Sequence, residues 1–232
     1  MERAFVYGDL LFESILFEDG LLKNLELHYE RLINSAKFLK MDIPIRFTFP
    51  FFESILKDEI QKQKIEQKSK IRFTLYRNAN GFYLPDNNSV NWMIEHFLMD
   101  ANQPKKEKVV GIYTDTYKSF HPLSNLKTGN SLVYVLASIF AKEKKWDDAL
   151  ILNEAGRVCE ASSSNFFWVK DEIWFTPPIS EGCIEGVKRA EILEKREVVE
   201  LECEIEDLEN ADEIYLCNAI QGLVKVKQLI LD

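Results

Sequence analysis

The stretch from Leu123 to Phe167 places the strongest constraint on what this chain can fold into. It begins L-S-N-L-K-T-G-N, runs into a strongly apolar segment at residues 132–141, and ends V-C-E-A-S-S-S-N-F-F. A helix that is apolar nearly all round has to be buried on most of its faces. The short apolar runs at residues 149–152, 158–160 and 166–169 have the length and turn spacing of strands. We therefore expect a buried helix followed by short strands.

The other segments of this half of the chain are also mostly strands. We expect them at residues 109–114, 173–175, 198–204, 213–216 and 222–226, with one further helix at 186–196. Several short strands with few helices indicate a sheet-rich domain.

The first hundred residues combine a sheet with two helices. Residues 4–7 and 10–17 are expected to form a hairpin around Gly8-Asp9, and residues 70–77 and 91–99 two more strands. Apolar residues at helical spacing predict helices at 25–40, capped by Asn24, and at about 48–61. The class is α+β. The polar segment 100–108 contains Pro104, so we predict a small N-terminal domain at 1–103, a linker at 104–107 and a larger domain at 108–232.

Composition excludes several classes of partner. The chain has 232 residues, 46% of them hydrophobic, and a formal net charge of -9, which disfavours nucleic acid because phosphate backbones need basic patches. No apolar run reaches membrane-spanning length, so no membrane partner is expected. The four cysteines are widely spaced, so no metal site is predicted. Without a signal peptide, the expected location is the reducing cytoplasm.

Lys127 and Glu160 stand at the edges of neighbouring elements. A lysine amine becomes nucleophilic when burial or a nearby positive potential lowers its pKa, and the positive end of a helix at 128–141 acts in that direction. A carboxylate stabilises the protonated ring nitrogen that makes a pyridoxal cofactor an electron sink. Either residue alone is more often an exposed side chain. Together they suit a carbonyl cofactor held as a Schiff base, and we interpret them as a pyridoxal 5'-phosphate site.

A phosphate needs backbone donors and a cation. Gly186, Val187 and Lys188 open the helix expected at 186–196, and the first turn of a helix offers unpaired N–H groups. Gly186 also allows close approach of the backbone. Arg31 could supply a bidentate cation from the helix at 25–40.

Six segments of the chain resemble the class-IV aminotransferases, the fold-type-IV group of pyridoxal phosphate enzymes. They are Y-G-D-L-L-F-E-S at 7–14, H-Y-E-R-L at 28–32, L-K-T-G-N at 126–130, E-A-S-S-S-N-F-F at 160–167, G-C-I-E-G-V-K-R at 182–189 and A-D-E-I-Y-L-C-N-A at 211–219. Any one of them is a weak signal, but six in the family's order are a strong one. The resemblance implies a two-domain α+β fold whose larger domain has a barrel-like β core, and a homodimer with its active site between the domains.

The resemblance also implies roles for individual residues. Lys127 would carry the cofactor and shuttle the proton, and Glu160 would pair with the pyridine nitrogen. The phosphate would be bound by Arg31, by the backbone at Gly186, Val187 and Lys188, and by the Asn218-Ala219 turn.

Within the family, two features resemble aminodeoxychorismate lyase, which acts in folate synthesis. Leu132 stands where branched-chain aminotransferases commonly carry a tyrosine, and the ending L-C-N-A-I-Q-G-L-V-K-V is similar to the lyase pattern L-x-N-[SA]-x-x-G-x-x-x-V. The substrate is then a small molecule with an amino group, and the products are 4-aminobenzoate and pyruvate.

Two alternatives stay open at this point. One is an aminotransferase of branched-chain or D-amino acids, and the other is a non-catalytic relative. The turn N-A-N-G-F-Y-L lacks the arginine that relatives often use for a substrate carboxylate. Ser14, Arg77 and Tyr83 are therefore tentative substrate-side residues, and Lys188 is a further substitute for the missing arginine.

Overall fold

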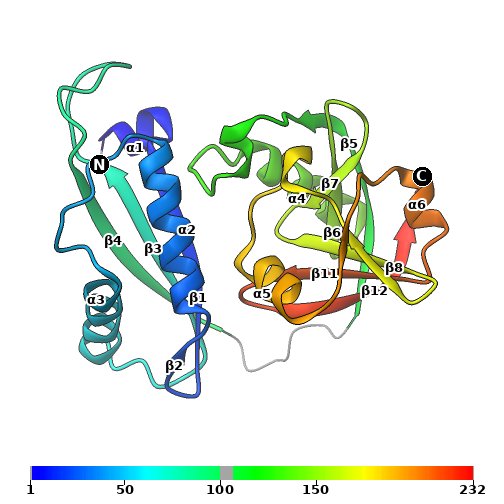
Figure 1. Ribbon diagram of the computed structural model, residues 1–232, viewed down its shortest axis with the longest axis horizontal. Coiled ribbons are helices and arrows are strands. Elements are labelled where there is room, and N and C mark those ends of the chain that lie inside the picture. The colour runs from blue at the N-terminus through cyan, green and yellow to red at the C-terminus, as the bar shows by residue number, and fades with distance from the viewer. Residues whose placement is uncertain (1, 100–106, 232) are drawn as a thin grey trace. The chain divides into compact units, whose positions relative to one another are not determined.

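The computed structural model describes residues 2–99 and 107–231, and its contacts divide the chain into two compact units. Unit 1 comprises residues 1–102 with 127–130, and unit 2 comprises 103–126 with 131–232. Most helices and strands of both units are labelled in Figure 1. No described helix is long and apolar enough to cross a membrane. The predicted linker at 104–107 stays a prediction, because residues 100–106 lie outside the described part of the chain.

Unit 1 is a four-stranded antiparallel sheet with helices. The strand order is β2-β1-β3-β4, and each neighbouring pair is antiparallel. Its elements are α1 (Glu2–Tyr7), β1 (Leu10–Glu18), β2 (Leu21–Leu22), α2 (Leu25–Phe38), α3 (Phe49–Lys62), β3 (Ser69–Arg77) and β4 (Val90–Leu98). Both long helices and all three long strands were predicted from their apolar periodicity to within two residues at most ends.

Aromatic side chains hold α3 against this sheet. Phe52 of α3 and Phe73 of β3 are both fully buried, with ring centroids 5.0 Å apart in an edge-to-face arrangement. The ring centroid of Phe47 lies 5.4 Å from that of Trp92 of β4 and 6.4 Å from that of Tyr29 of α2. Such pairs add to the free energy gained by burying the rings. The aromatic residues therefore join two helices to the same face of the sheet.

The strand predicted at residues 4–7 is wrong, because these residues form the end of α1. Gly8 closes this helix with a φ of 64°, and its N–H donates to the carbonyl of Ala4 at 3.1 Å. A glycine adopts this left-handed conformation without strain. The predicted cap of α2 also differs: Asn24 occupies the N-cap position with a φ of 52° but makes no side-chain capping bond.

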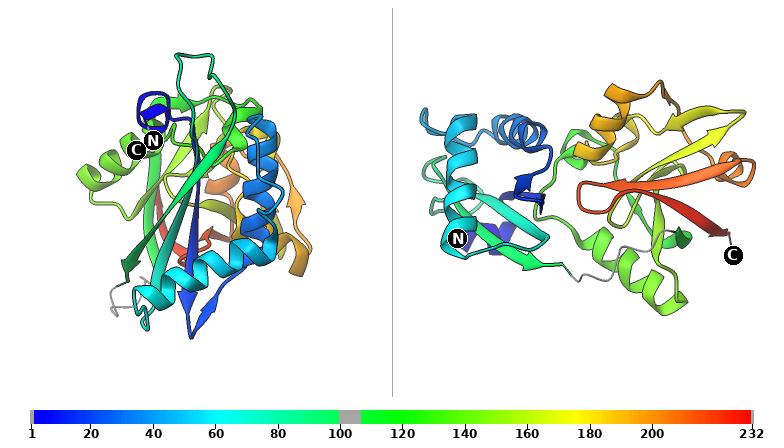
Figure 2. Two further views of the ribbon diagram at one scale, coloured as in Figure 1. Left: turned by 90° about the vertical axis from the view of Figure 1, so that its left-hand side faces the viewer. Right: turned by 90° about the horizontal axis from the view of Figure 1, so that it is seen from below.

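Unit 2 contains an eight-stranded mixed sheet that curls into a half-barrel (Figure 2). The order is β10-β9-β8-β11-β12-β5-β6-β7. The strands are β5 (Glu107–Lys118), β6 (Asp148–Asn153), β7 (Val158–Ala161), β8 (Asn165–Lys170), β9 (Ile173–Thr176), β10 (Val199–Glu200), β11 (Glu213–Asn218) and β12 (Gly222–Ile230). The helices are α4 (Leu132–Lys144), α5 (Val187–Lys195) and α6 (Ile205–Glu209), with 3₁₀ turns at Pro122–Asn125 and Ile179–Glu181. The predicted fold class, α+β with a barrel-like core in the larger domain, is confirmed.

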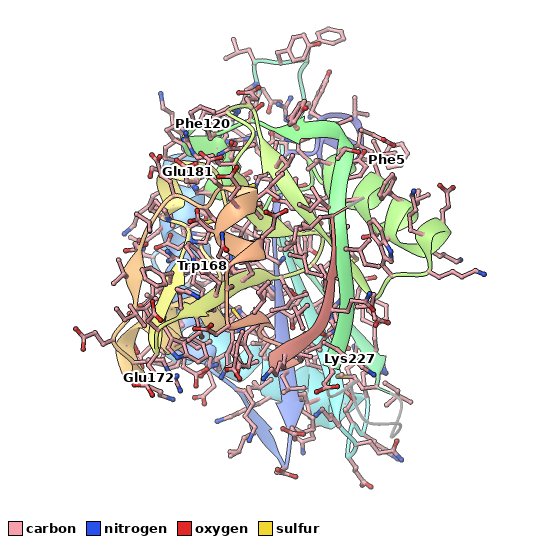
Figure 3. The ribbon with its side chains drawn as sticks, turned by 90° about the vertical axis from the view of Figure 1, so that its right-hand side faces the viewer. Phe5, Phe120, Trp168, Glu172, Glu181 and Lys227 are labelled. Atoms are coloured by element: carbon pink, nitrogen blue, oxygen red, sulfur yellow. The ribbon has the colours of Figure 1, made fainter. Side chains whose placement is uncertain are left out.

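The main core of unit 2 lies on one face of this sheet. It contains Val110, Leu150, Phe166 and Trp168, all 3% exposed or less, and Trp168 is labelled in Figure 3. The expectation for α4 is confirmed only in part: Ala137 and Ala141 are buried against β5 and β6, while Leu132, Val135, Leu136 and Ile139 are exposed in this single chain. One helix therefore keeps an apolar face that the described chain does not cover.

Three predicted strands of unit 2 differ from the structure in length. The strand expected at 198–204 is reduced to the two residues of β10, and α6 follows it. The N–H of Glu204 donates to Asp207 at 2.8 Å in a capping box, which favours the helix. In contrast, β5 and β12 are longer than predicted, because they pair with each other in parallel along residues 107–111 and 225–230.

Candidate functional site

Lys127 lies in an extended segment that attaches to the edge of β1. The N–H of Phe12 donates to the carbonyl of Lys127 at 3.0 Å, and the N–H of Gly129 donates to that of Leu10 at 3.2 Å. This pairing places residues 127–130 in unit 1. Helix α4 begins only at Leu132, so the expectation of a helix from residue 128, with its positive end beside Lys127, is wrong. The ammonium of Lys127 instead stands 4.5 Å from the centroid of the Phe12 ring.

Arg31 belongs to a buried ionic cluster centred on Glu13. Arg31 Nε donates to Glu13 Oε1 at 2.8 Å, and a second guanidinium nitrogen contacts Oε2. His28 Nδ1 lies 2.6 Å from the same Oε2, and both His28 and Glu13 are at most 1% exposed. Because α2 carries His28 and Arg31 while β1 carries Glu13, the cluster fixes the predicted phosphate-binding arginine against the sheet.

The cluster shifts the pKa values of its members. Burial alone would raise the pKa of Glu13, but the Arg31 charge and the contact with His28 outweigh burial and lower it to about 2. Burial lowers the pKa of His28, opposed by Glu13 and assisted by the positive charges of Arg31 and Lys127. The positive charge of Lys127 thus lowers the pKa of His28, a member of the cluster that holds Arg31.

These shifts predict an acid-sensitive unit 1. The pKa values of Glu13 and His28 in the folded protein lie below the usual 4.5 for Glu and 6.5 for His. The unfolded chain therefore binds more protons in acid, and the free energy of unfolding decreases as the pH is lowered. We expect a first loss as pH drops below 6.5, from His28, and a second between 4.5 and about 2, from Glu13. Urea unfolding at a series of pH values measures both, and in Glu13→Gln the second loss should be smaller. A pH-independent unfolding free energy would contradict the assignment.

The opposite face of the same sheet carries a residue that the sequence analysis did not select. Arg72 of β3 is paired in register with Ser14 of β1, so both side chains lie on one face, with Phe12 two residues away. The guanidinium of Arg72 stands 4.4 Å from the Phe12 ring centroid. Its buried Nε has no hydrogen-bond partner among the described residues. Arg72 and Lys127 thus contact the same ring, beside the predicted Ser14.

Arg77, in contrast, is used inside unit 1. Its guanidinium donates to Asp9 at 2.9 Å and to the carbonyls of Leu39 and Lys40 at 2.8 and 3.3 Å, and it also contacts Asn88. Tyr83, the other tentative substrate-side residue of this hairpin, is 89% exposed in the single chain. Its substrate role stays a prediction, as does that of Arg77.

In unit 2, Glu160 is buried and held at both oxygens. It lies in the predicted strand, β7, which extends one residue further to Ala161, and it is 3% exposed. Its Oε1 accepts from Tyr134 Oη at 2.8 Å and from Lys118 Nζ, and Oε2 accepts from the N–H of Ile184 at 3.0 Å. The pKa of the Tyr134 phenol is strongly raised by burial and by the Glu160 charge, so the phenol stays a donor. Neither Lys118 nor Tyr134 was predicted.

The helix start expected at residues 186–188 is observed as the N-terminus of α5. Gly186 is the N-cap, and no side chain caps the helix there. A Cβ at Gly186 would meet Asn165 Oδ1 at 1.9 Å, so the glycine is required by this side chain. The amide of Asn165 in turn donates to the carbonyl of Ile184 at 2.8 Å. Glu160 and the first turn of α5 are therefore linked through residues 184–186.

Two cations extend from this first turn. Lys188 Nζ donates to Glu191 at 2.9 Å, and its role as a substitute for the missing arginine stays a prediction. Arg189 is 4% exposed, donates to the carbonyl of Pro177 at 2.9 Å, is ion-paired with Glu200, and keeps a buried Nε without a partner among the described residues. The uncapped N–H groups of the first turn of α5 suit an anion.

The predicted Asn218-Ala219 turn is held by its own side chain. Asn218 Oδ1 accepts from the N–H groups of Ile220 and Gln221 at 3.0 and 2.8 Å, and its amide donates to the carbonyl of Ser163 at 3.1 Å. The turn between β11 and β12 is therefore fixed to the Ser-rich loop after Glu160. This arrangement positions Ala219, whose role toward the phosphate stays a prediction.

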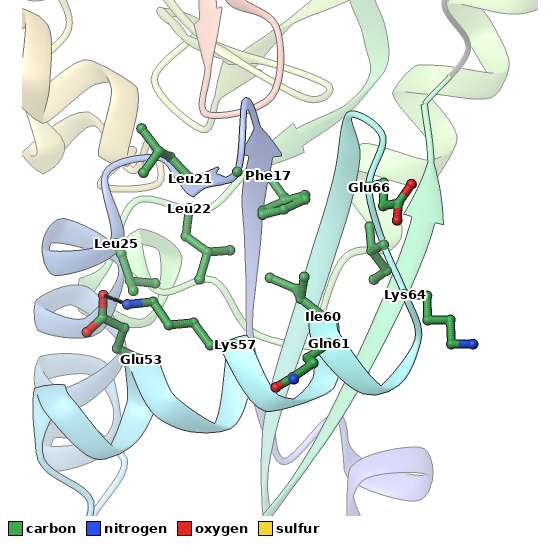
Figure 4. A pocket seen from close by; sticks show the side chains of 12 residues that line it. Phe17, Leu21, Leu22, Leu25, Glu53, Lys57, Ile60, Gln61, Lys64 and Glu66 are labelled. Atoms are coloured by element: carbon green, nitrogen blue, oxygen red, sulfur yellow. Dashed lines mark ion pairs between the residues drawn. The ribbon is translucent and has the colours of Figure 1, made fainter.

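A separate groove of about 510 Å³ lies wholly within unit 1 (Figure 4). Apolar side chains including Phe17, Leu22 and Ile60 line it, and the ion pair of Glu53 with Lys57, 2.7 Å long, stands at its side. None of the predicted cofactor or substrate residues lines this groove. It is therefore distinct from the candidate site.

Comparison with known proteins decides the family. The amino-transferase class IV family model matches residues 10–229, which is nearly the whole chain. The chain belongs to the class IV aminotransferase family. Class IV aminotransferases use pyridoxal 5'-phosphate, and solved structures of similar fold contain it or its pyridoxamine form, so the predicted cofactor and an enzymatic role are confirmed.

Individual members of the class IV family are distant in sequence. The chain is 28% identical to an aminodeoxychorismate lyase of Vibrio harveyi over 97% of its length and 84% of the relative. It is 25% identical to a D-alanine aminotransferase of Staphylococcus epidermidis, over 98% and 82%. A solved branched-chain amino acid aminotransferase of Escherichia coli superposes with a TM-score of 0.88 at 22% identity, covering 98% of this chain and 79% of that one.

The described residues fit the cofactor of the class IV family. A carboxylate has about four acceptor positions. Glu160 uses three of them in the described contacts, so Oε2 keeps one for a ring N–H. The uncapped start of α5 offers N–H donors for a phosphate. Within unit 2, Glu160 thus offers an acceptor for the ring N–H, and the first turn of α5 offers donors for the phosphate.

Proposed function

We propose that the protein is an aminodeoxychorismate lyase, which converts 4-amino-4-deoxychorismate to 4-aminobenzoate and pyruvate in folate synthesis. The observation that carries this proposal is the turn at Asn218–Gly222, where L-C-N-A-I-Q-G is stabilised by the Asn218 side chain. This sequence is the lyase-like pattern singled out above. The 28% identity to the Vibrio harveyi lyase along almost the whole chain supports the same choice.

The residues divide the chemistry between them. The bound cofactor supplies an electron sink for negative charge at the substrate's α-carbon. Lys127 would hold the cofactor and would take the α-proton of the substrate on Nζ. Glu160 would accept a hydrogen bond from the ring N–H through Oε2. Arg31, the first-turn amides of α5 and the Asn218-Ala219 turn would bind the phosphate.

The competing activity is transamination of D-amino acids or branched-chain amino acids, favoured by the similarity to the Staphylococcus enzyme and the Escherichia fold. Single-turnover spectroscopy with the holoenzyme separates the two. With aminodeoxychorismate and no added keto acid, a lyase should release one pyruvate per turn and return to its starting spectrum. A stable conversion of the cofactor to its pyridoxamine form, without pyruvate, would refute the lyase.

Arg72 is our candidate for the substrate carboxylate. Its buried Nε lacks a partner among residues 2–99 and 107–231, and its guanidinium lies beside the ring that Lys127 also contacts. We expect Arg72→Met to raise KM by about 10- to 100-fold, the usual worth of a charge-assisted hydrogen bond, with little change in the cofactor spectrum. Arg77→Met is the matched comparison and should lower stability instead, since Arg77 donates within unit 1. Equal effects of both variants on KM would count against Arg72.

We further propose a homodimer. Phe82, Tyr83 and Leu84 follow one another at the tip of the β3–β4 hairpin and are each at least 85% exposed in the single chain. Three consecutive exposed apolar side chains are typical of a surface that is covered by a partner. Sedimentation analysis should give a dimer, and replacing all three by serine should shift it toward the monomer.

A further inference from the structure

Glu160 is paired with a second lysine that the roles assigned above do not use. Lys118 is the last residue of β5 and is 6% exposed, and its ammonium contacts Glu160 Oε1. The same ammonium stands 5.1 Å from the centroid of the Tyr134 ring, whose hydroxyl donates to Oε1. Burying a lysine and a glutamate is costly unless they pair well. We therefore expect the buried pair of Lys118 and Glu160 to have a function at the cofactor site.

The pairing of the β5 backbone fixes the position of Lys118. The register of β5 against β6 shifts between Tyr113 and Lys118, and Lys118 resumes the pairing opposite Asn153. Its carbonyl accepts from the N–H of Glu154 at 3.1 Å. Such an irregularity changes the direction in which the next side chain points. Lys118 is thus fixed by the sheet on the Oε1 side of Glu160.

Three other titratable groups near Glu160, namely Cys159, Cys183 and Tyr134, have raised pKa values. Burial, and after it the Glu160 charge, raises the pKa of Cys183 to about 12 and that of Cys159 well above its usual value. The Tyr134 phenol is likewise held in its protonated form. Lys118 therefore supplies the positive charge that balances the Glu160 carboxylate in the described part of unit 2.

The contacts of Glu160 are also asymmetric. Oε1 is occupied by Lys118 and Tyr134, while Oε2 accepts a single N–H, from Ile184. Two donors on one oxygen fix the rotation of the carboxylate. The acceptor position that remains therefore lies on Oε2.

We propose that Lys118 is a positioning residue that keeps Glu160 a carboxylate and directs its Oε2 to the ring nitrogen of the cofactor. The inference rests on the proposed function of Glu160. Without the ammonium, a buried carboxyl group is driven toward its neutral form, and it then no longer offers a charge to the protonated ring. Lys118 acts through Glu160 and does not itself bind the cofactor.

The test measures pyridoxal 5'-phosphate affinity of the full-length protein by absorbance titration across about pH 5 to 8, where an ordinary carboxyl group is ionised. Lys118→Met should weaken binding by about 10- to 100-fold and make it pH-dependent near neutrality. Lys118→Arg keeps the charge and should restore most of the affinity. Tyr134→Phe removes a neutral donor from the same oxygen, so it should weaken binding less and leave the pH profile flat.

Glu160→Gln distinguishes the proposed role of Glu160 from the proposed role of Lys118. If Glu160→Gln loses affinity while Lys118→Met matches the wild type at every pH, the Lys118 inference fails and the role of Glu160 stands. If Glu160→Gln binds as the wild type does, the proposed role of Glu160 fails. Should Lys118→Met not fold, the infrared difference between wild type and Glu160→Gln decides: a protonated-carboxyl band of Glu160 at neutral pH would overturn the inference, and its absence supports it.

Discussion

Replacing Lys127 with alanine is expected to abolish covalent attachment of the cofactor and to lower turnover by about 10⁴-fold or more. Lys127 is proposed both to hold the cofactor and to move the α-proton, and loss of a positioned acid–base group alone costs up to about 10⁴-fold. Absorbance of the purified holoprotein before and after borohydride, followed by peptide mapping of the reduced lysine, measures the attachment. The steady-state kcat measures the proton transfer.

Lys57→Ala is the control for this experiment. Lys57 belongs to α3 of the same unit, and its side chain is 63% exposed. It should leave the spectrum, the label and kcat unchanged. Recovery of the borohydride label at Lys118 in the wild-type protein, or an unchanged spectrum in Lys127→Ala, would disprove the assignment.

Glu13→Ala is expected to lower the free energy of unfolding by about 3–5 kcal/mol, the usual cost of removing one partner from a buried ion pair. The variant leaves Arg31 and His28 without their shared carboxylate, although their side chains are only 10% and 0% exposed. The loss should appear as a lower urea midpoint. Affinity for inorganic phosphate or pyridoxal phosphate should also fall, since Arg31 is no longer held.

The same strand offers a matched control in Glu18→Ala. Glu18 pairs with Lys68 at 2.7 Å, but both side chains are about a third exposed. Solvent screening limits such a pair to about 1 kcal/mol or less. Equal losses from the two variants would show that burial of the Glu13 cluster contributes nothing particular.

Helices with regular apolar spacing and the short strands β6, β7, β8 and β9 were predicted closely, whereas α1 and the length of β10 were not. The 3.6-residue pattern of α2 and α3 locates them closely, because one face of each is buried against the sheet. Residues 4–7, A-F-V-Y, have strand-forming side chains, yet Gly8 ends a short helix there. In six residues a single backbone constraint outweighs propensity.

The sequence predicts cofactor residues, but it does not predict the side chains that surround them. Lys127, Glu160 and Arg31 follow from chemistry and motif, whereas their partners come from distant parts of the chain. The alternation of I-R-F-T-L-Y-R in β3 could have indicated that Arg72 shares a face with its strand neighbours, and this signal was available. The segment T-D-T-Y-K does not predict the contact of Lys118 with Glu160. The direction of the Lys118 side chain depends on a register shift between β5 and β6.

The pairing of residues 127–130 with β1 has a consequence for how the protein is made on the ribosome. The chain leaves unit 1, enters unit 2 at residue 103, returns for four residues and departs again. Unit 1 cannot complete the edge of β1 until residue 130 has left the exit tunnel, by which time the first strand of unit 2 has also emerged. Contacts between residues this far apart in sequence slow folding. Lys127 therefore reaches its place only after the strands of unit 1 have been synthesised and are available to pair with its segment.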